Sequence, residues 1–299
     1  MNKHSHSSGN PSVRLVISIL LNAIITLVEI SGGILSNSMA LISDAIHNLS
    51  DTLALMLSWI ANNVGGRKPN SRRTFGYKRF EILSAFLNAS ILTAISIYLM
   101  YVAILRFVHP EPVKTKIMLI IAIIGLAANL GSMLFLRSHS HKNLNIKAAY
   151  VHLLGDTLSS LVVIGGAVII YFTRFLWVDP LLTIIISLVI IYQAYKVLRE
   201  SVDILMQSTP ESLDLSEIKL YLEKIPLIRN IHHVHCWRLQ DNDILFEAHI
   251  ETTKDLQLSE TGKLLKEVET QLRKDFHITH TTLQVEFEVC DDKEMIRQP

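Results

Sequence analysis

Six apolar segments, each long enough to cross a lipid bilayer as a helix, limit the possible folds of this chain more than any other feature. A bilayer core requires roughly 20 mostly apolar residues per helix. The connections between the segments are short, which is typical of a compact helical bundle. We therefore expect an α-helical membrane protein. Its predicted transmembrane helices are Val13–Leu35, Ala40–Val64, Phe80–Phe107, Thr115–Leu136, Ile146–Phe172 and Asp179–Leu198.

The chain changes character after Ser208. Of its 27 acidic residues, 18 lie beyond that point, although the whole chain is 49% hydrophobic and only 18% charged. This distribution favours a membrane domain followed by a water-soluble one. We expect a His-containing cytoplasmic tail at 1–12, a six-helix transmembrane transport domain at 13–207, and a cytoplasmic regulatory and dimerisation domain at 208–299.

The soluble part shows the apolar spacing of helices in two segments and the partial alternation of strands in three others. In chain order these are Leu213–Ile225, Asn230–Leu239, Ile244–Thr252, Leu256–Phe276 and Thr281–Glu288. The order helix–strand–strand–helix–strand predicts a small, two-layer α+β domain of the ferredoxin-like, metallochaperone-like kind. Because a domain of about 90 residues has a thin core, dimerisation would stabilise it.

Charge and cysteine content indicate the orientation and the compartment. Thirteen Lys and Arg residues flank the ends of the apolar segments on the side of the N-terminus, and four flank the other side. Because positive charge accumulates on the inner side, we expect both termini in the cytoplasm. Two cysteines, Cys236 and Cys290, suit a reducing compartment. The net charge of +1, without a long basic run, argues against a nucleic-acid partner.

A repeated pair of ionisable residues in the second and fifth segments carries the main functional signal. His47 precedes Asp51 by four residues, and His152 precedes Asp156 by four. Residues four apart lie on the same face of a helix. Ionisable groups inside a membrane are costly, and they are usually functional or paired. Two such faces turned toward each other would supply two imidazoles and two carboxylates, enough to surround a tetrahedral metal ion.

Other polar residues in the apolar segments leave alternatives open. Asp44 lies one turn before His47, and a supporting role at a metal site or a packing or capping role fits it equally well. For Glu29, a structural role and a proton-relay role are both compatible with the sequence. Asn22, Asn88 and Asn129 are of a type that more often forms hydrogen bonds between helices than binds ions.

These motifs resemble those of the cation diffusion facilitator family, and most closely those of its zinc-type members. The family pattern Ser-x-Ala-Leu-x-x-Asp-Ala-x-His-x-x-x-Asp is matched over residues 38–51. Further matches are Phe75-Gly76-Tyr77, Asn143-Leu144-Asn145 and Asp179-Pro180. The resemblance covers nearly the whole chain. It implies a homodimer in the bacterial inner membrane that exports metal from the cytosol in exchange for protons.

The resemblance also implies a metal site in the soluble domain. The family's regulatory ligands fall on His232, His249 and Glu286 in this sequence. His233 replaces the usual Asp, and Gln284 stands where some members have another His, which leaves the number of ions open. Simple strand alternation places His232, Val234 and Cys236 on one face of the strand. Any one of these histidines alone would more often be an ordinary surface or core residue.

The ligand types indicate which ion is moved. Imidazole favours transition metals over Mg²⁺ and Ca²⁺, so a site of two His and two Asp suits Zn²⁺ first, then Co²⁺ and Cd²⁺. Metal binding requires neutral His and ionised Asp, and protons would therefore displace the metal. Zn²⁺ is expected as substrate and as a regulatory ion, with no organic cofactor. Two short tracts, His4-Ser-His6 and His139-Ser-His141, could gather metal loosely near the entrance.

Three rival functions fit the sequence less well than a secondary active transporter does. An intramembrane metallohydrolase needs an open coordination position and a nearby general base, but four protein ligands would fill the sphere here. A membrane metal sensor that does not transport has no need of ligands at mid-membrane. A channel is disfavoured because four tight ligands would hold the ion rather than let it pass quickly. Transport without enzymatic chemistry is therefore the favoured function.

Overall fold

The computed structural model describes residues 11–137, 144–240, 243–289 and 294–296, and it separates into two compact units. Within these ranges, the structure does not describe the side chains of residues 11–21, 55, 59, 62, 132–133, 135–137 and 144–153. The first unit consists of the described parts of Met1–Ile60 and Ser84–Leu198, and the second of those of Ala61–Leu83 and Arg199–Pro299.

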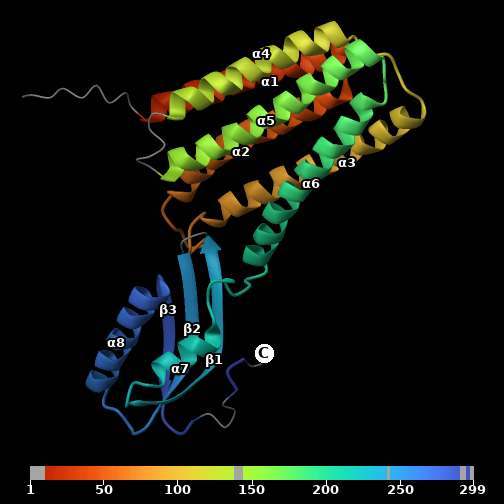
Figure 1. Ribbon diagram of the computed structural model, residues 1–299. Helices are drawn as coiled ribbons and strands as arrows, with labels where there is room; N and C mark the ends of the chain where they lie inside the picture. Colours follow the sequence, from red (N-terminus) through yellow and green to blue (C-terminus); the bar gives the residue numbers. More distant parts are fainter. Residues whose placement is uncertain (1–10, 138–143, 241–242, 290–293, 297–299) are drawn as a thin grey trace, which may run out of the picture. The chain divides into compact units, whose positions relative to one another are not determined.

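Long helices account for nearly all of the first unit (Figure 1). In the described residues they are α1 (Pro11–Ser36), α2 (Met39–Gly65), α3 (Arg79–Val108), α4 (Thr115–Arg137), α5 (Leu144–Thr173) and α6 (Val178–Leu205). Helix α4 packs against α1 and α5, and α2 runs alongside α5. A buried cluster joins α2, α4, α5 and α6 through residues such as Leu41, Met118, Val163 and Ile190.

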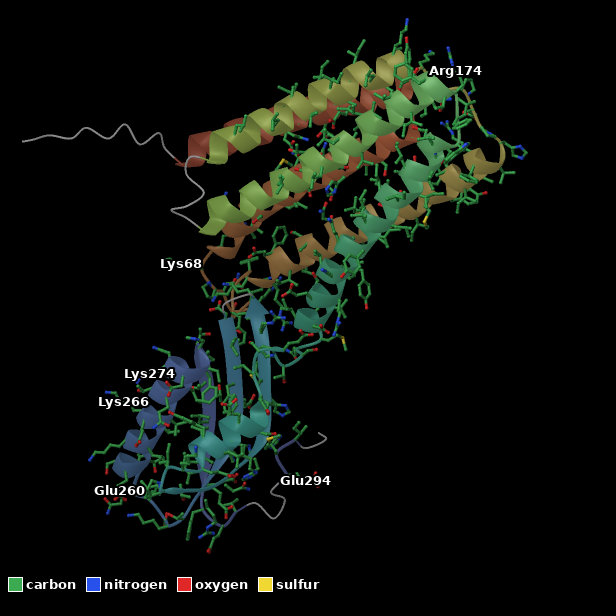
Figure 2. All side chains as sticks on the ribbon, viewed as in Figure 1. Lys68, Arg174, Glu260, Lys266, Lys274 and Glu294 are labelled. Carbon is green, nitrogen blue, oxygen red and sulfur yellow. The ribbon has the colours of Figure 1, made fainter. Side chains whose placement is uncertain are left out.

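The outer surface of these helices is apolar. On α3, the side chains of Leu87, Ile91, Tyr98 and Tyr101 are each more than half exposed. Over the described residues, Arg79–Val108, Leu154–Thr173 and Val178–Leu205 are long and apolar enough to cross a membrane, and two shorter apolar helical stretches accompany them. An apolar surface of this extent indicates a lipid environment. Figure 2 shows Arg174, a charged residue, at the connection between α5 and α6.

A carboxylate of α6 fixes the start of α2. Asp179 is buried, and it accepts hydrogen bonds from the Ser38 hydroxyl at 2.5 Å and from the backbone N–H groups of Met39 and Ala40 at 2.9 and 3.3 Å. The first N–H groups of a helix have no partner within the helix, so an acceptor must come from elsewhere. Here the acceptor is a side chain of α6, which thereby fixes the N-terminal end of the helix that carries His47.

Polar side chains also join the helices pairwise. The Asn22 amide donates to the Thr52 hydroxyl at 2.9 Å, and the Asn88 amide donates to the Ser50 hydroxyl at 3.2 Å. The expected hydrogen bonds between helices are thus confirmed for these two residues. For Asn129, the amide nitrogen is buried and has no hydrogen-bond partner among the described residues.

The second unit contains a three-stranded sheet with two helices. Helix α7 (Leu215–Leu222) precedes β1 (Ile228–Gln240) and β2 (Asp243–Thr252), and helix α8 (Leu258–Phe276) joins β2 to β3 (His280–Glu286). The sheet order is β1-β2-β3, with β1 antiparallel and β3 parallel to β2. Both helices bury apolar residues against one face of the sheet. This cluster includes Ile218, Leu222, Leu264, Val268, Leu272, Ile231, Val234, Phe246 and Ile250.

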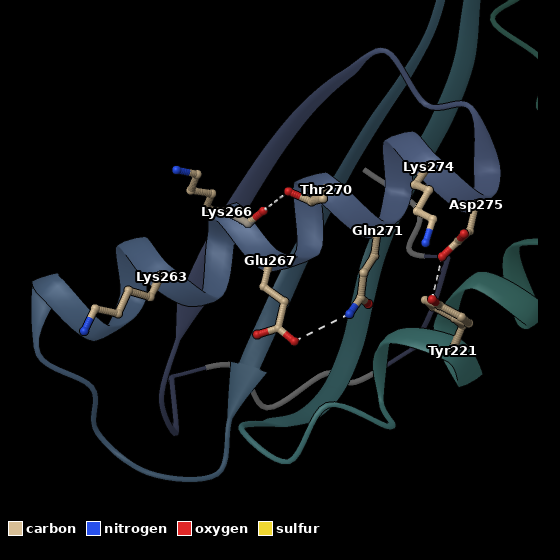
Figure 3. Close-up of a pocket in the computed structure, with 8 residues that line it drawn as sticks. All are labelled: Tyr221, Lys263, Lys266, Glu267, Thr270, Gln271, Lys274 and Asp275. Atoms are coloured by element: carbon tan, nitrogen blue, oxygen red, sulfur yellow. Dashed lines mark hydrogen bonds between the residues drawn. The ribbon is translucent and has the colours of Figure 1, made fainter.

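The outer surfaces of α7 and α8 are polar. Lys266, Lys274 and Glu260 of α8 and Glu294 of the C-terminal segment are among the charged residues labelled in Figure 2. Between the two helices, the Tyr221 hydroxyl donates to Asp275 at 2.6 Å, and Gln271 donates to Glu267 one turn earlier (Figure 3). Part of the lining of the hollow at this place therefore consists of groups that already bind one another.

A β-bulge in β1 changes which side chains share a face. His232 pairs with His249 and His235 pairs with Glu247, so two residues of β1, His233 and Val234, stand against one residue of β2. Paired residues point to the same side of a sheet. His232 and His235 therefore lie on the side of His249, whereas Val234 and Cys236 join the apolar core. The prediction that His232, Val234 and Cys236 share one face is wrong, because the extra residue reverses the alternation.

Candidate metal centres

The first candidate centre lies in the helical unit, where α2 meets α5. Nε2 of His47 lies 3.7 Å from Oδ2 of Asp51 and 3.7 Å from Oδ1 of Asp156. His47 and Asp51 come together because they are one turn apart on α2, while Asp156 approaches from α5. Each residue offers one ligand atom, and the three atoms lie within 4.8 Å of one another.

These spacings suit a small metal ion. Zn–N and Zn–O bonds of about 2.0–2.1 Å with tetrahedral angles separate two ligand atoms by about 3.3 Å. A small inward movement of the side chains would bring the two carboxylate oxygens from 3.7 Å to that separation from Nε2 of His47. The arrangement can thus hold a metal through one imidazole and two carboxylates, with a coordination position left for a fourth ligand.

The electrostatics of this unit also favour a cation. Its buried acids are Glu29, Asp44, Asp156 and Asp179, and no Lys or Arg is buried among the side chains that the structure describes. Carboxylates in a low-dielectric interior are costly unless they are hydrogen-bonded or paired with a cation. A divalent cation bound between α2 and α5 would offset part of that cost.

Two of these acids are held by polar neighbours close to the centre. Asp44 accepts a short hydrogen bond from the Ser159 hydroxyl, which connects α2 to α5 one turn from His47. Glu29 accepts from the Asn48 amide at 2.8 Å. Glu29 also lies against Gly125 of α4, where an added Cβ would meet its Oε1 at 2.1 Å. A side chain at 125 would therefore displace the Glu29 carboxylate, and the alternatives for Asp44 and Glu29 both remain compatible with their positions.

A cavity opens beside the centre. It is lined by residues of α2, α5 and α6, among them His47, Asp156, Ser159 and Gln193, and its volume is about 480 Å³. A water molecule occupies roughly 30 Å³ in the liquid. The cavity therefore has room for an ion that arrives with several of its waters.

Some predicted residues lie outside the described parts. His152 belongs to α5, four residues before Asp156, but its side chain is not among those described. Its role as the fourth ligand stays a prediction. The histidines at 4, 6, 139 and 141 and the thiol of Cys290 also lie outside the described residues.

The second candidate centre lies on the sheet of the second unit. Oε1 of Glu286 is 3.0 Å from Nε2 of His232 and 2.8 Å from Nδ1 of His249. Strand pairing sets His232 directly opposite His249, and β3 brings Glu286 beside Glu251, two residues further along β2. His232 is 1% exposed and Glu286 is 8% exposed. Nε2 of His232 makes no hydrogen bond despite its closeness to Glu286.

The structure brings together six of the seven predicted ligands, in two groups of three. Two features that organise these groups were not predicted from the sequence. The first is Asp179, which fixes the start of α2 although it lies 140 residues beyond Met39 in the chain. Its position in an Asp-Pro pair at a helix start was the available signal, since acids are common there. The second is the bulge at His233, which has a φ of 52°. No glycine stands near this position in the sequence to indicate a left-handed backbone conformation.

Comparisons with known proteins identify a transmembrane part and a cytoplasmic part of the chain. The family model for the cation efflux transmembrane domain matches residues 15–206, and that for the cation efflux protein cytoplasmic domain matches residues 210–288. The chain is 39% identical over 299 residues to the cadmium, cobalt and zinc/H(+)-K(+) antiporter of Bacillus subtilis, covering 99% of this chain and 96% of that protein.

Two further relatives show similar coverage. Zinc transporter ZitB of Escherichia coli is 38% identical over 294 residues, which is 96% of this chain and 93% of the relative. Metal cation efflux system protein CzcD of Cupriavidus metallidurans is 35% identical over 288 residues, 96% of this chain and 90% of the relative. The similarity therefore spans both units.

Proposed function

This chain belongs to the cation efflux family, and from that premise we propose that it exports Zn²⁺ from the cytosol through the centre formed by α2 and α5. The family resemblance read from the sequence is confirmed, and the chain is a membrane transporter rather than an enzyme. The relatives are named for zinc, cadmium and cobalt, which supports a divalent transition metal as the substrate.

One observation carries the proposal more than any other. The ligand atoms of His47, Asp51 and Asp156 converge in a unit whose buried charges are acidic. His152 lies one helical turn before Asp156, so we assign it the fourth position of a tetrahedral His₂Asp₂ site. Two Asp charges then balance the charge of the ion.

The same ligands define the order of preference among metals. Two imidazoles disfavour Mg²⁺ and Ca²⁺, which prefer oxygen ligands. The absence of thiolate from the proposed set disfavours Cu⁺. Zn²⁺ fits a tetrahedral set of nitrogen and oxygen atoms best, and Co²⁺ and Cd²⁺ are the expected secondary substrates.

We propose proton antiport as the coupling mechanism. An ion can bind only when the imidazoles are neutral and the carboxylates ionised, so loading from the cytosol releases protons and protonation from the other side releases the metal. Alternating exposure of one site to the two sides of the membrane completes the cycle. The name of the Bacillus subtilis relative supports exchange with H⁺.

The architecture that goes with this function is also a proposal. We assign all six helices α1–α6 to membrane spans, with both termini in the cytosol and the protein in the bacterial inner membrane. The order α7-β1-β2-α8-β3 supports the ferredoxin-like fold for the cytoplasmic domain. That domain would join two copies of the chain and would bind a regulatory Zn²⁺ through His232, His249 and Glu286.

Flux into proteoliposomes that contain a zinc-sensitive dye tests the transport proposal. Wild-type protein should carry Zn²⁺ inward, and an imposed proton gradient of the correct sign should increase the rate. A protein that binds Zn²⁺ tightly but shows no flux would be a sensor, and this proposal would be wrong. Indifference of the flux to the proton gradient would remove the antiport mechanism alone.

A further inference from the structure

Four histidine rings form a continuous chain on one face of the sheet. The ring centroids of His232 and His249 are 5.5 Å apart, those of His249 and His233 are 4.6 Å apart, and those of His233 and His235 are 5.2 Å apart. The proposed regulatory site uses only the first two of these histidines. The other two have no role in the function derived so far.

The bulge in β1 is what gathers these rings. His233 is the extra residue, and its φ of 52° lies in the left-handed region that residues other than glycine rarely adopt. A backbone conformation of this kind is strained, and such strain is common at ligand sites. Without the extra residue, His232 and His235 would point to opposite sides of the sheet.

The bulge is held in place from outside the sheet. The backbone N–H of His233 donates to the carbonyl of Glu294 at 3.2 Å, and that of Val234 donates to the carbonyl of Met295 at 2.8 Å. Met295 also packs against the apolar core of the unit. The positions of His233 and His235 are therefore fixed by the fold, which lowers the entropic cost of binding a ligand there.

We propose that His233 and His235 form a second binding site for one divalent transition-metal ion, next to the buried site of His232, His249 and Glu286. Two imidazoles bound to one tetrahedral Zn²⁺, with Zn–N bonds of about 2.05 Å, place their ring centroids about 5.2 Å apart. The His233–His235 pair has that separation. Water would fill the remaining coordination positions.

Burial increases along the chain of rings from His235 to His232, and it determines which pair an incoming ion meets first. His235 is exposed, His233 and His249 are partly buried, and His232 is buried. An ion from solvent meets the outer pair first, and His249 adjoins both pairs. The outer pair accepts borderline and soft divalent ions such as Zn²⁺, Co²⁺ and Cu²⁺, because imidazole selects against Mg²⁺ and Ca²⁺. This site does not depend on transport by the helical unit.

Metal content of the full-length protein in detergent tests the proposal. After dialysis against Zn²⁺, the double variant His233→Asn/His235→Gln should hold about one ion per protomer fewer than wild type. Asparagine is chosen at 233 because it tolerates positive φ. The matched control is His277→Asn, an exposed histidine with φ of 57° at the end of α8, and it should keep the wild-type metal content.

The variants separate the outer site from the buried one. Glu286→Gln should lose the buried ion and keep the outer one, so combining it with the double variant should remove both. A double variant with unchanged metal content would overturn the proposal. Loss of the same single ion in the double variant and in Glu286→Gln, without a further loss on combination, would also overturn it, because there would be one site only.

A measurement on wild-type protein keeps the test valid if a variant does not fold. Diethyl pyrocarbonate modifies accessible histidines, and mass spectrometry of fragment ions locates the modified residue. Saturating Zn²⁺ should slow modification of His235 several-fold and leave His277 unaffected. Equal rates at His235 with and without Zn²⁺ would contradict a metal site there.

Discussion

The helical centre and the sheet centre use the same ligand atoms, imidazole nitrogen and carboxylate oxygen, but the chain builds them differently. In the helical unit, one turn of α2 sets His47 beside Asp51, and only Asp156 must arrive from another helix. In the sheet, His232, His249 and Glu286 come from three strands, and hydrogen-bonded pairing sets each position. The first arrangement is mostly local, and the second is entirely long-range.

This difference has a mechanical consequence. Helices that pack through side chains can slide or tilt against one another, so the distance from Asp156 to the His47–Asp51 pair can change during a transport cycle. Strands joined by backbone hydrogen bonds keep their register. A centre between helices is therefore suited to releasing its ion, whereas a centre on a sheet is suited to keeping it.

The largest expected effect comes from removing a helical ligand. Asp51→Ala and Asp156→Ala should each lower Zn²⁺ flux in proteoliposomes by at least about 100-fold, because loss of a ligand exceeds the 10–100-fold cost of losing a supporting partner. His249→Ala in the sheet should keep measurable flux. If His249→Ala abolished transport as fully as Asp156→Ala did, the two centres would not have separate roles.

A matched control distinguishes ligand loss from loss of negative charge. Glu111 is an exposed acid in the connection between α3 and α4, where it pairs with Arg106 at 3.0 Å. Glu111→Gln also removes one negative charge from the helical unit, and it should transport Zn²⁺ at close to the wild-type rate. A strong defect in this control would mean that the flux responds to net charge instead.

The second effect is stabilisation of the sheet by metal. A ligand at 100 times its dissociation constant stabilises the folded state by about 2.7 kcal/mol. Zn²⁺ should therefore slow hydrogen exchange of the β1 and β2 amides in wild type more than it does in Glu286→Gln, because that variant keeps only the outer ion. Exchange followed by mass spectrometry measures both proteins. Equal protection by Zn²⁺ in the two proteins would exclude Glu286 as a ligand.

A smaller effect, on the free energy of unfolding, is expected from removing each of two helix caps, one in each unit. Asp179 is buried and caps α2 from another helix, whereas Asp214 is exposed and caps its own helix α7 by accepting from Ser216 N–H at 2.8 Å. Asp214→Ala should cost about 1 kcal/mol, as other exposed caps do. Asp179→Ala should cost about 2 kcal/mol, because it leaves buried donors without an acceptor.

Thermal unfolding in detergent measures the loss of stability in Asp179→Ala, and hydrogen exchange of the α7 amides measures the loss in Asp214→Ala. Asp179→Asn, which keeps an acceptor oxygen, should recover part of the loss. If Asp179→Ala were as mild as Asp214→Ala, other contacts would suffice to fix the start of α2.

The same contrast between local and long-range placement decides which features the sequence predicts. Long apolar segments predicted both ends of α1–α5 and the start of α6 to within about two residues, because helix boundaries follow local hydrophobicity. Helix α6 continues beyond its predicted end at Leu198 to Leu205. The His47–Asp51 pair was visible because its spacing is local. The cap from Asp179 and the bulge at His233 were not visible, since both depend on which distant segments meet. The faces of β1 were therefore assigned wrongly at His232.

The smallest effect is expected at Cys236, and it tests the bulge directly. Burial in the apolar core raises the pKa of the Cys236 thiol to about 12, so at pH 8 only about one molecule in 10,000 carries the reactive thiolate. In a Cys290→Ser background, folded protein should react very slowly with a maleimide at pH 8, and unfolded protein should react quickly. Because the folded pKa lies above the unfolded one, this group stabilises the fold below about pH 9, and that contribution is lost as the pH rises toward 12.

Zn²⁺ makes the same labelling experiment a test of strand register. With the bulge, Cys236 lies in the core, on the side of the sheet away from His232 and His249. Zn²⁺ should therefore leave the slow labelling rate nearly unchanged. Regular alternation would place Cys236 on the side of His232, where the thiol would be accessible and a bound ion would protect it. Rapid labelling that Zn²⁺ suppresses would thus contradict the bulge, and with it the cluster of four histidines that the bulge creates.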